Sequence, residues 1–261
     1  MIGSIRKYTS LFRIRYINTL QYRIAALSGL STQFAWGTML ILAFSAFYRS
    51  NPDAFPMTFS QITSYVWIQQ AFVVMFFVFM GDSEISSAIR EGSIAYEMVR
   101  PMNLYNRWLC QIIASRLSRV TLRCIPIILV ASFLPYPFGL SFPPSIWQFL
   151  LFIFSMALSL GVTSAILGLM YISLFYTLNQ AGITGIGYSF IPFFPEPLLS
   201  VVQVLPFASM QDVPLRIFNG HIYGTDLIQS LALQVFWLAV LLLIGHLLMG
   251  RALKRVVVQG G

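Results

Sequence analysis

The sequence predicts an all-α, polytopic membrane protein with six transmembrane helices. The 261-residue chain is 57% hydrophobic and only 9% charged, and its mean hydropathy is +0.77. Soluble domains carry charge on about a quarter of their residues, so the charged side chains here are too few to cover a soluble protein of this size. Apolar runs of span length recur along the chain, and lipid is the expected solvent for most of its surface.

A basic, amphipathic stretch opens the chain and is predicted to form an N-terminal interfacial helix over residues 4–22. Its apolar face would carry Ile5, Leu11, Phe12, Tyr16 and Leu20, and its basic face Arg6, Lys7, Arg13 and Arg15. Such a helix lies in the membrane interface with its basic side toward anionic lipid. The alternative is an ordinary basic flank without a defined docking surface. We divide the chain into this segment, 1–23, and one transmembrane domain, 24–261.

The six spans are predicted at residues 24–47, 62–80, 117–134, 146–171, 178–194 and 227–249. Four prolines between positions 135 and 144 mark a boundary after the third span, because proline cannot continue a helix. The stretch from 146 to 194 contains no charged residue and is longer than the ~20 residues of one crossing. We therefore divide it near residues 175–180.

Prolines interrupt the region between the fifth and sixth spans. Pieces such as 198–205 and 213–218 are apolar but too short to cross a membrane. Broken backbone at membrane depth is tolerated only where other protein buries it or where it lines a cavity. The pattern predicts two short re-entrant helices that dip in from the outer side.

Lysine and arginine are distributed unevenly along the chain. The segments 1–23, 81–123 and 250–261 hold fourteen of the sixteen. Such residues concentrate in cytoplasmic segments, so both termini are expected in the cytoplasm. Because the excess positive charge flanks the spans, the net charge of +8 does not indicate a nucleic acid partner.

The segment between the second and third spans concentrates charge, with six charged residues from Asp82 to Arg100. Asp82 or Ser83 can cap a short helix, and Gly92 is placed to end it in the left-handed conformation. Mixed charge on a short capped helix suits docking into a groove of a soluble partner. The alternative is a solvated connector that only helps to orient the spans.

The sequence indicates no enzyme. It lacks the G-x-x-x-x-G-K-[ST] loop of ATPases, and it has no metal-ligand spacing. Its polar residues within spans are candidates either for a substrate path or for contacts between helices: Gln69, Gln70, Asn179 and Gln180. Three arginines on one face of the cytoplasmic extension of the third span could bind lipid phosphates or extend toward the interface: Arg116, Arg119 and Arg123.

Four motifs, in order, resemble ABC-2 type exporter permeases with six spans and roughly 260 residues. The first is the cytoplasmic motif formed by Ile89, Gly92, Ile94, Val99, Arg100 and Pro101. The others are F-I-P-F-F-P at 190–195 with L-P-F at 205–207, V-P-L-R-I-F-N-G at 213–220, and the ending L-K-R-V-V-V-Q-G-G. Each motif is weak alone, but together they cover nearly the whole chain. The neutral turn at 175–180 departs from the charged or tryptophan-containing turn of the family.

This resemblance implies that the cytoplasmic helix is a coupling helix that contacts a separate P-loop ATPase subunit. The residues assigned to this contact are Glu84, Ile85, Ile89, Arg90, Glu91, Gly92, Ile94, Arg100 and Pro101. The ATPase subunit would bind ATP and magnesium, and this chain would hold no cofactor. The chain would reside in the bacterial inner membrane, dimerise with an identical or related permease, and export an amphiphile such as a drug, antibiotic peptide, lipid or glycolipid. The alternatives are a non-transporting scaffold or sensor and a self-sufficient channel.

Overall fold

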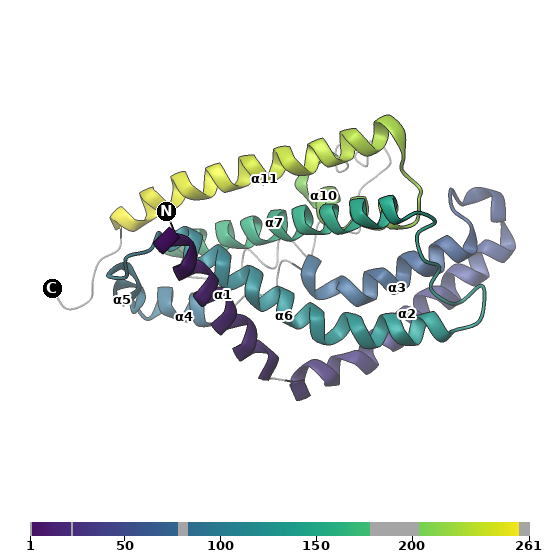
Figure 1. Ribbon diagram of the computed structural model, residues 1–261, viewed down its shortest axis with the longest axis horizontal. Helices are drawn as coiled ribbons and strands as arrows, with labels where there is room; N and C mark the ends of the chain where they lie inside the picture. The colour runs from purple at the N-terminus through teal and green to yellow at the C-terminus, as the bar shows by residue number, and fades with distance from the viewer. Residues whose placement is uncertain (1, 22, 78–82, 178–203, 256–261) are drawn as a thin grey trace.

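The computed structural model describes residues 2–21, 23–77, 83–177 and 204–255, and no strand occurs among them (Figure 1). The helices are α1 (Ile2–Gln21), α2 (Arg23–Ser50), η1 (Pro52–Ala54), α3 (Phe59–Phe76), α4 (Ser83–Arg90), α5 (Ile94–Met98), α6 (Leu104–Phe133), α7 (Ile146–Thr177), α10 (Pro206–Phe218), α11 (Gly224–Ala252) and η2 (Leu253–Arg255). The predicted all-α class is confirmed for this part of the chain.

The long helices form an elongated bundle in which α7 and α11 run side by side (Figure 1). At one end, which we call the basal end, lie the start of α1, the short helices α4 and α5, and the end of α11. At the opposite, distal end lie η1 and the connection from α6 to α7. The fold thus gathers the start of α1, the charged segment and the end of α11 at one end.

Among the described residues, three helices are long and apolar enough to cross a membrane by length and composition, within Gly29–Ser50, Ile146–Thr177 and Gly224–Ala252. They match three of the six predicted spans. The second and third predicted spans overlap α3 and α6, which carry glutamines and arginines that lower their hydropathy. The predicted span 178–194 lies outside the described residues, so six spans remain a prediction.

Helix α7 continues to Thr177, beyond the predicted end of the fourth span at residue 171. The sequence offers no glycine or proline there that would stop it. Packing favours the extension, because Leu174 is buried and the Phe175 ring stacks on Trp108 with centroids 6.0 Å apart. The neutral stretch at 175–180 therefore begins as helix.

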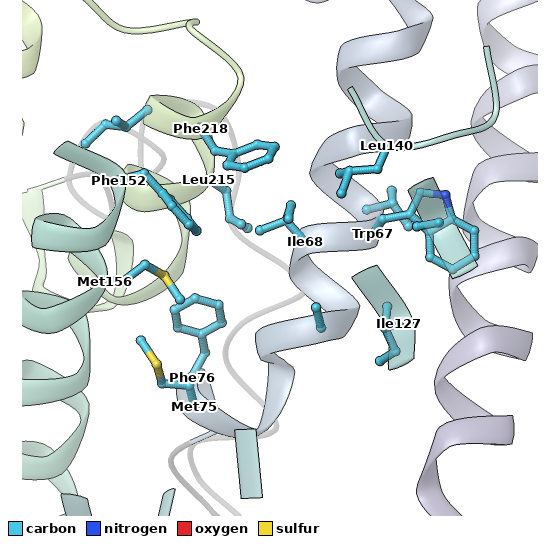
Figure 2. Packing of buried hydrophobic residues seen from close by; sticks show 14 of the residues in the cluster. Trp67, Ile68, Met75, Phe76, Ile127, Leu140, Phe152, Met156, Leu215 and Phe218 are labelled. Carbon is cyan, nitrogen blue, oxygen red and sulfur yellow. The ribbon is translucent and has the colours of Figure 1, made fainter. Parts of the chain in front are cut away.

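Helix α3 occupies the centre of the main hydrophobic core. Figure 2 shows Ile68 directed toward Leu215 and Phe218 of α10, while Trp67 lies on the opposite side of α3, near Leu140. Trp67 is 3% exposed, and its indole N–H donates to the Phe138 carbonyl over 2.9 Å. The core thus joins α3 to α10 on one side and to the distal connection between α6 and α7 on the other.

The proline-rich region after the described part of α7 differs from the sequence prediction. The sequence pattern predicts that prolines divide it into short pieces, one of them at 213–218. The structure instead has a single helix, α10, that begins at Pro206 and runs through Pro214 to Phe218. Proline is well tolerated in the first turn of a helix. Pro214, however, lacks the N–H that would bond to the carbonyl four residues earlier, that of Met210.

Side chains from the surrounding helices bind the carbonyls of α10. Ser159 of α7 donates to the Met210 carbonyl, the group that Pro214 leaves without its helical partner. Gln234 of α11 donates to the Ser209 carbonyl over 2.7 Å, and Gln148 of α7 to the Ile217 carbonyl over 2.8 Å. Ser159 and Gln234 are both fully buried. Protein groups therefore replace the water that an interrupted helix would otherwise need.

We expect the Ser159→Ala variant to be destabilised by about 1–3 kcal/mol, because the Met210 carbonyl would be buried without a partner. In a Pro214→Ala background the restored N–H can bond to that carbonyl, so the same serine change should cost less. Thermal unfolding of the four proteins in detergent gives the coupling energy. Ser132→Ala, which removes a bond to a carbonyl of its own exposed helical turn, is the control. An equal cost in both backgrounds would contradict this account.

Candidate functional site

The charged segment folds into a compact unit, which we call the interspan element: α4, the turn at Gly92, α5 and the residues to Pro101. Gly92 has a φ of +73°, and a Cβ at this position would meet nothing within 4 Å. Its left-handed conformation, rather than a lack of space, is what favours glycine. The predicted cap Asp82 and the side chain of Ser83 lie outside the described residues.

One face of the interspan element is buried at the basal end. Ile85, Ile89 and Ile94 are 4%, 7% and 1% exposed. They join a basal cluster from the adjacent ends of three long helices, made of Leu104, Tyr105, Trp108 and Ile112 of α6, Leu167, Tyr171, Ile172 and Leu174 of α7, and Met249 and Ala252 of α11. A displacement of the interspan element would therefore act on α6, α7 and α11 together.

The opposite face is exposed and combines charge with apolar surface. Of the residues that the sequence assigned to the coupling contact, Arg90, Glu91, Arg100 and Pro101 lie on this face and are exposed. The sequence-based contact residues did not include Tyr96, Met98 and Val99, which are 81%, 44% and 84% exposed, although Val99 belongs to the cytoplasmic motif. Helical phase could have found Tyr96. It is two residues after the buried Ile94, and residues two apart on a helix point to roughly opposite faces. We call these seven residues the exposed coupling face.

Glu97, also absent from the sequence-based assignment, fixes α5 to α6. Its carboxylate accepts from the Arg107 guanidinium over 2.7 Å and from the Trp108 indole over 3.3 Å. The Arg107 side chain is only 4% exposed, so the pair is largely desolvated and each group needs the other. Trp108 in turn packs edge to face on Tyr171. The exposed coupling face thus rests on a rigid base.

Helix α1 contacts both the interspan element and α6. Arg15 forms a bidentate ion pair with Glu84 of α4. The Tyr16 hydroxyl donates to Thr121 of α6, and Ser118 of α6 donates to the Tyr16 carbonyl, each over 3.0 Å. These contacts dock α1 on the bundle, so it is not the basic flank without a docking surface that the sequence left as an alternative. Glu84 therefore belongs to the junction with α1 rather than to the exposed coupling face.

The Arg15–Glu84 pair depends on pH. The hydrogen bond from Arg15 lowers the pKa of the Glu84 carboxyl below its usual value, because it favours the ionised form. A lowered folded-state pKa stabilises the fold above the ordinary pKa, and this contribution is lost as the pH falls through the lowered value. The contribution is small because the Glu84 side chain is 59% exposed. The pair is fully formed at neutral pH.

Arg116 does not extend toward the membrane interface, as the sequence suggested. It is 2% exposed, and its guanidinium donates to the carbonyls of Val74, Met75 and Phe77 over 3.0, 2.8 and 2.9 Å. The last carbonyls of any helix lack internal partners, and a positive charge there also complements the helix dipole. Arg116 is thus a cap that ties the end of α3 to α6.

The four residues proposed for a substrate path have different positions. Gln69 lines a cavity of about 450 Å³ between α2, α3 and α10. Gln70 is 8% exposed, with its Cγ 3.2 Å from where Gly37 of α2 would carry a Cβ, so it packs between helices. Asn179 and Gln180 lie outside the described residues. Within the described ranges, no group of His, Cys, Asp and Glu could hold a metal ion.

Tyr105 of α6 fits against a glycine of α11. A Cβ on Gly245 would overlap the Tyr105 hydroxyl, and the Tyr105 ring packs edge to face on His246 with centroids 4.7 Å apart. Tyr105 is 1% exposed, so it has little room to withdraw. This close approach fixes α11 against the basal cluster.

We expect Gly245→Ala to separate α11 from α6 and to destabilise the protein by about 1–3 kcal/mol, as overpacked cores do. Gly250→Ala is the matched control, since a Cβ there meets nothing within 4 Å. It should be neutral or stabilising by up to about 1 kcal/mol, because alanine favours helix over glycine. Melting temperatures in detergent measure both effects. Equal effects of the two substitutions would show that the approach at Tyr105 is not a constraint.

Residues 34–260 match a family model described as "ABC-2 family transporter protein". The match spans most of the chain, including the interspan element, α10 and α11. Neither the curated proteins nor the solved structures yield a match to this chain.

Proposed function

The chain belongs to the ABC-2 family of transporter proteins, and on that premise we propose that it is the permease subunit of an ATP-driven exporter. The observation that carries this proposal is the interspan element, with its exposed coupling face backed by the basal cluster. Glu84, Ile85, Ile89 and Ile94 then act as its supports, and Gly92 sets its turn. The outward residues Arg90, Glu91, Arg100 and Pro101 form the contact with the ATPase, together with Tyr96, Met98 and Val99.

The energy source must lie in another chain. The sequence has no G-x-x-x-x-G-K-[ST] loop, and neither Lys7 nor Lys254 stands before a serine or threonine. We therefore assign ATP and magnesium to separate P-loop ATPase subunits that dock at the basal end. An aromatic residue with flanking arginines is typical of the centre of a protein interface, and Tyr96 between Arg90 and Arg100 fits this description.

The proposed function also includes an orientation of the chain in the membrane and a second permease subunit. The basal end faces the cytoplasm, because it gathers segments rich in lysine and arginine. We propose a bacterial inner membrane protein with both termini inside, six spans within 24–261, and α1 at the lipid interface. A second permease subunit, identical or related, completes the transport path. The cargo is an amphiphile by family analogy.

Coupling should depend on the conformation of Gly92. Valine at a φ of +73° is strained by about 1–3 kcal/mol, so Gly92→Val should distort the end of α4 while leaving membrane insertion intact. Each 1.4 kcal/mol of lost docking energy weakens binding about tenfold. Gly224 is the matched control, because it also has a positive φ of +58° and open space but lies at the start of α11.

The test is a mild-detergent pull-down of the tagged chain from its native cells, comparing wild type, Gly92→Val and Gly224→Val. We expect a P-loop ATPase to co-purify with wild type and Gly224→Val, and about tenfold less of it with Gly92→Val. Equal loss in both variants would contradict the assigned docking site. A chain that purifies without any ATPase would contradict the exporter proposal and favour a scaffold, sensor or channel.

A further inference from the structure

We propose that the cavity lined by Gln69 and Asp212 is a binding site for a lipophilic cation, with the positive head at Asp212 and the apolar body between α2 and α3. The inference deepens the proposed function, on which it rests for its role, by assigning a cargo class and a place where cargo binds. The binding itself is a property of this chain alone.

The cavity has the size and location for an amphiphile. Its volume of about 450 Å³ lies within the range typical of small-molecule sites, about 300–1,000 Å³. Its walls begin at Phe55 near the distal end, and its lining residues on α3 run from Ile62 to Gln69. Seven helical residues span about 10 Å, so the cavity extends through about a third of the thickness of a bilayer's hydrocarbon core.

The walls are apolar and aromatic. Leu40 and Phe44 of α2 face the cavity, as do Phe55 and Tyr65. Rings hold an apolar body by area burial, and the faces of such rings also attract cations within about 6 Å. Gln69 adds an amide that can donate or accept a hydrogen bond at the far end. This combination of apolar walls with few polar groups is what binds and orients amphiphilic ligands.

Asp212 is the only ionisable acid or base among the described lining residues apart from the Tyr65 phenol. The Tyr65 hydroxyl donates to Oδ1 over 3.4 Å, and Arg216 Nη1 lies 3.6 Å from Oδ2. Charge-assisted hydrogen bonds to a carboxylate are normally about 2.7–2.9 Å long from a guanidinium and about 2.5–2.7 Å from a hydroxyl, so both partners hold the carboxylate loosely. A carboxylate can accept about four hydrogen bonds. Asp212 therefore keeps acceptor capacity for a ligand.

The charge of the cavity selects the class of ligand. Arg216 neutralises Asp212 in part, but it is one helical turn further along α10 and does not line the cavity. The pair thus presents its negative end to the ligand. A lipophilic anion would be repelled, and a neutral apolar molecule would desolvate the carboxylate without compensation. A cation gains from both the carboxylate and the rings.

The test uses two probes of nearly equal shape and opposite charge, tetraphenylphosphonium and tetraphenylborate. Binding of each to the purified chain in nanodiscs is measured by equilibrium dialysis, with empty nanodiscs as the blank. We expect saturable binding of tetraphenylphosphonium and none of tetraphenylborate. Asp212→Asn, which keeps the side-chain shape, should weaken phosphonium binding about tenfold. Asp226→Asn, an exposed acid at the start of α11, should leave it unchanged.

A second variant guards against loss of folding. Arg216→Gln removes the cation that competes for Asp212 and should tighten phosphonium binding about threefold or more, an effect that misfolding cannot produce. Equal binding of both probes, or phosphonium binding unaffected by Asp212→Asn, would overturn the proposal. The absence of saturable phosphonium binding would also overturn it, even where an ATPase co-purifies. Conversely, phosphonium binding that depends on Asp212 in a chain without an ATPase partner would retain the site and reject the exporter.

Discussion

Backbone carbonyls that lack helical partners inside an apolar bundle are the constraint on which this fold depends. In lipid, each such group costs several kcal/mol unless protein satisfies it. Arg116 meets this need at the end of α3, and Ser159 and Gln234 meet it along α10. These polar side chains come from α6, α7 and α11. The same hydrogen bonds that satisfy broken backbone therefore also determine which helices lie together.

The interspan element extends this arrangement to the surface. Its isoleucines enter the basal cluster, and Glu97 is held by Arg107 and Trp108. Phe77, the first residue after α3, is held by the cap that Arg116 forms. The exposed coupling face is consequently carried by elements that pack closely on one another. A partner that moves this face moves the ends of α6, α7 and α11 with it.

Composition was sufficient for the helical class, and capping signals were sufficient for a helix at α4 ending before Gly92. The family was reached through the resemblance of four motifs. They failed where tertiary contacts override local signals. Pro214 predicts a break in the helix. The helix continues because Ser159 of another helix donates a hydrogen bond to the carbonyl that Pro214 leaves without its helical partner. Arg116 reads as a membrane-interface residue, because the end of α3 that needs it is distant in sequence. Tyr96 was missed because the sequence assigned Ile94 to the contact surface, whereas the basal cluster buries Ile94 and leaves the opposite face of α5 exposed.

The Tyr105 hydroxyl against Gly245 has a mechanical consequence. A phenol seated in the notch of a glycine sets the axial register of α11 on α6, and sliding by one helical turn, about 5.4 Å, would drive the ring into a side chain such as Leu241 or Met249. Tilting about the notch keeps the hydroxyl at the glycine. Whatever conformational cycle the protein follows, these two helices should pivot about this point rather than translate along one another.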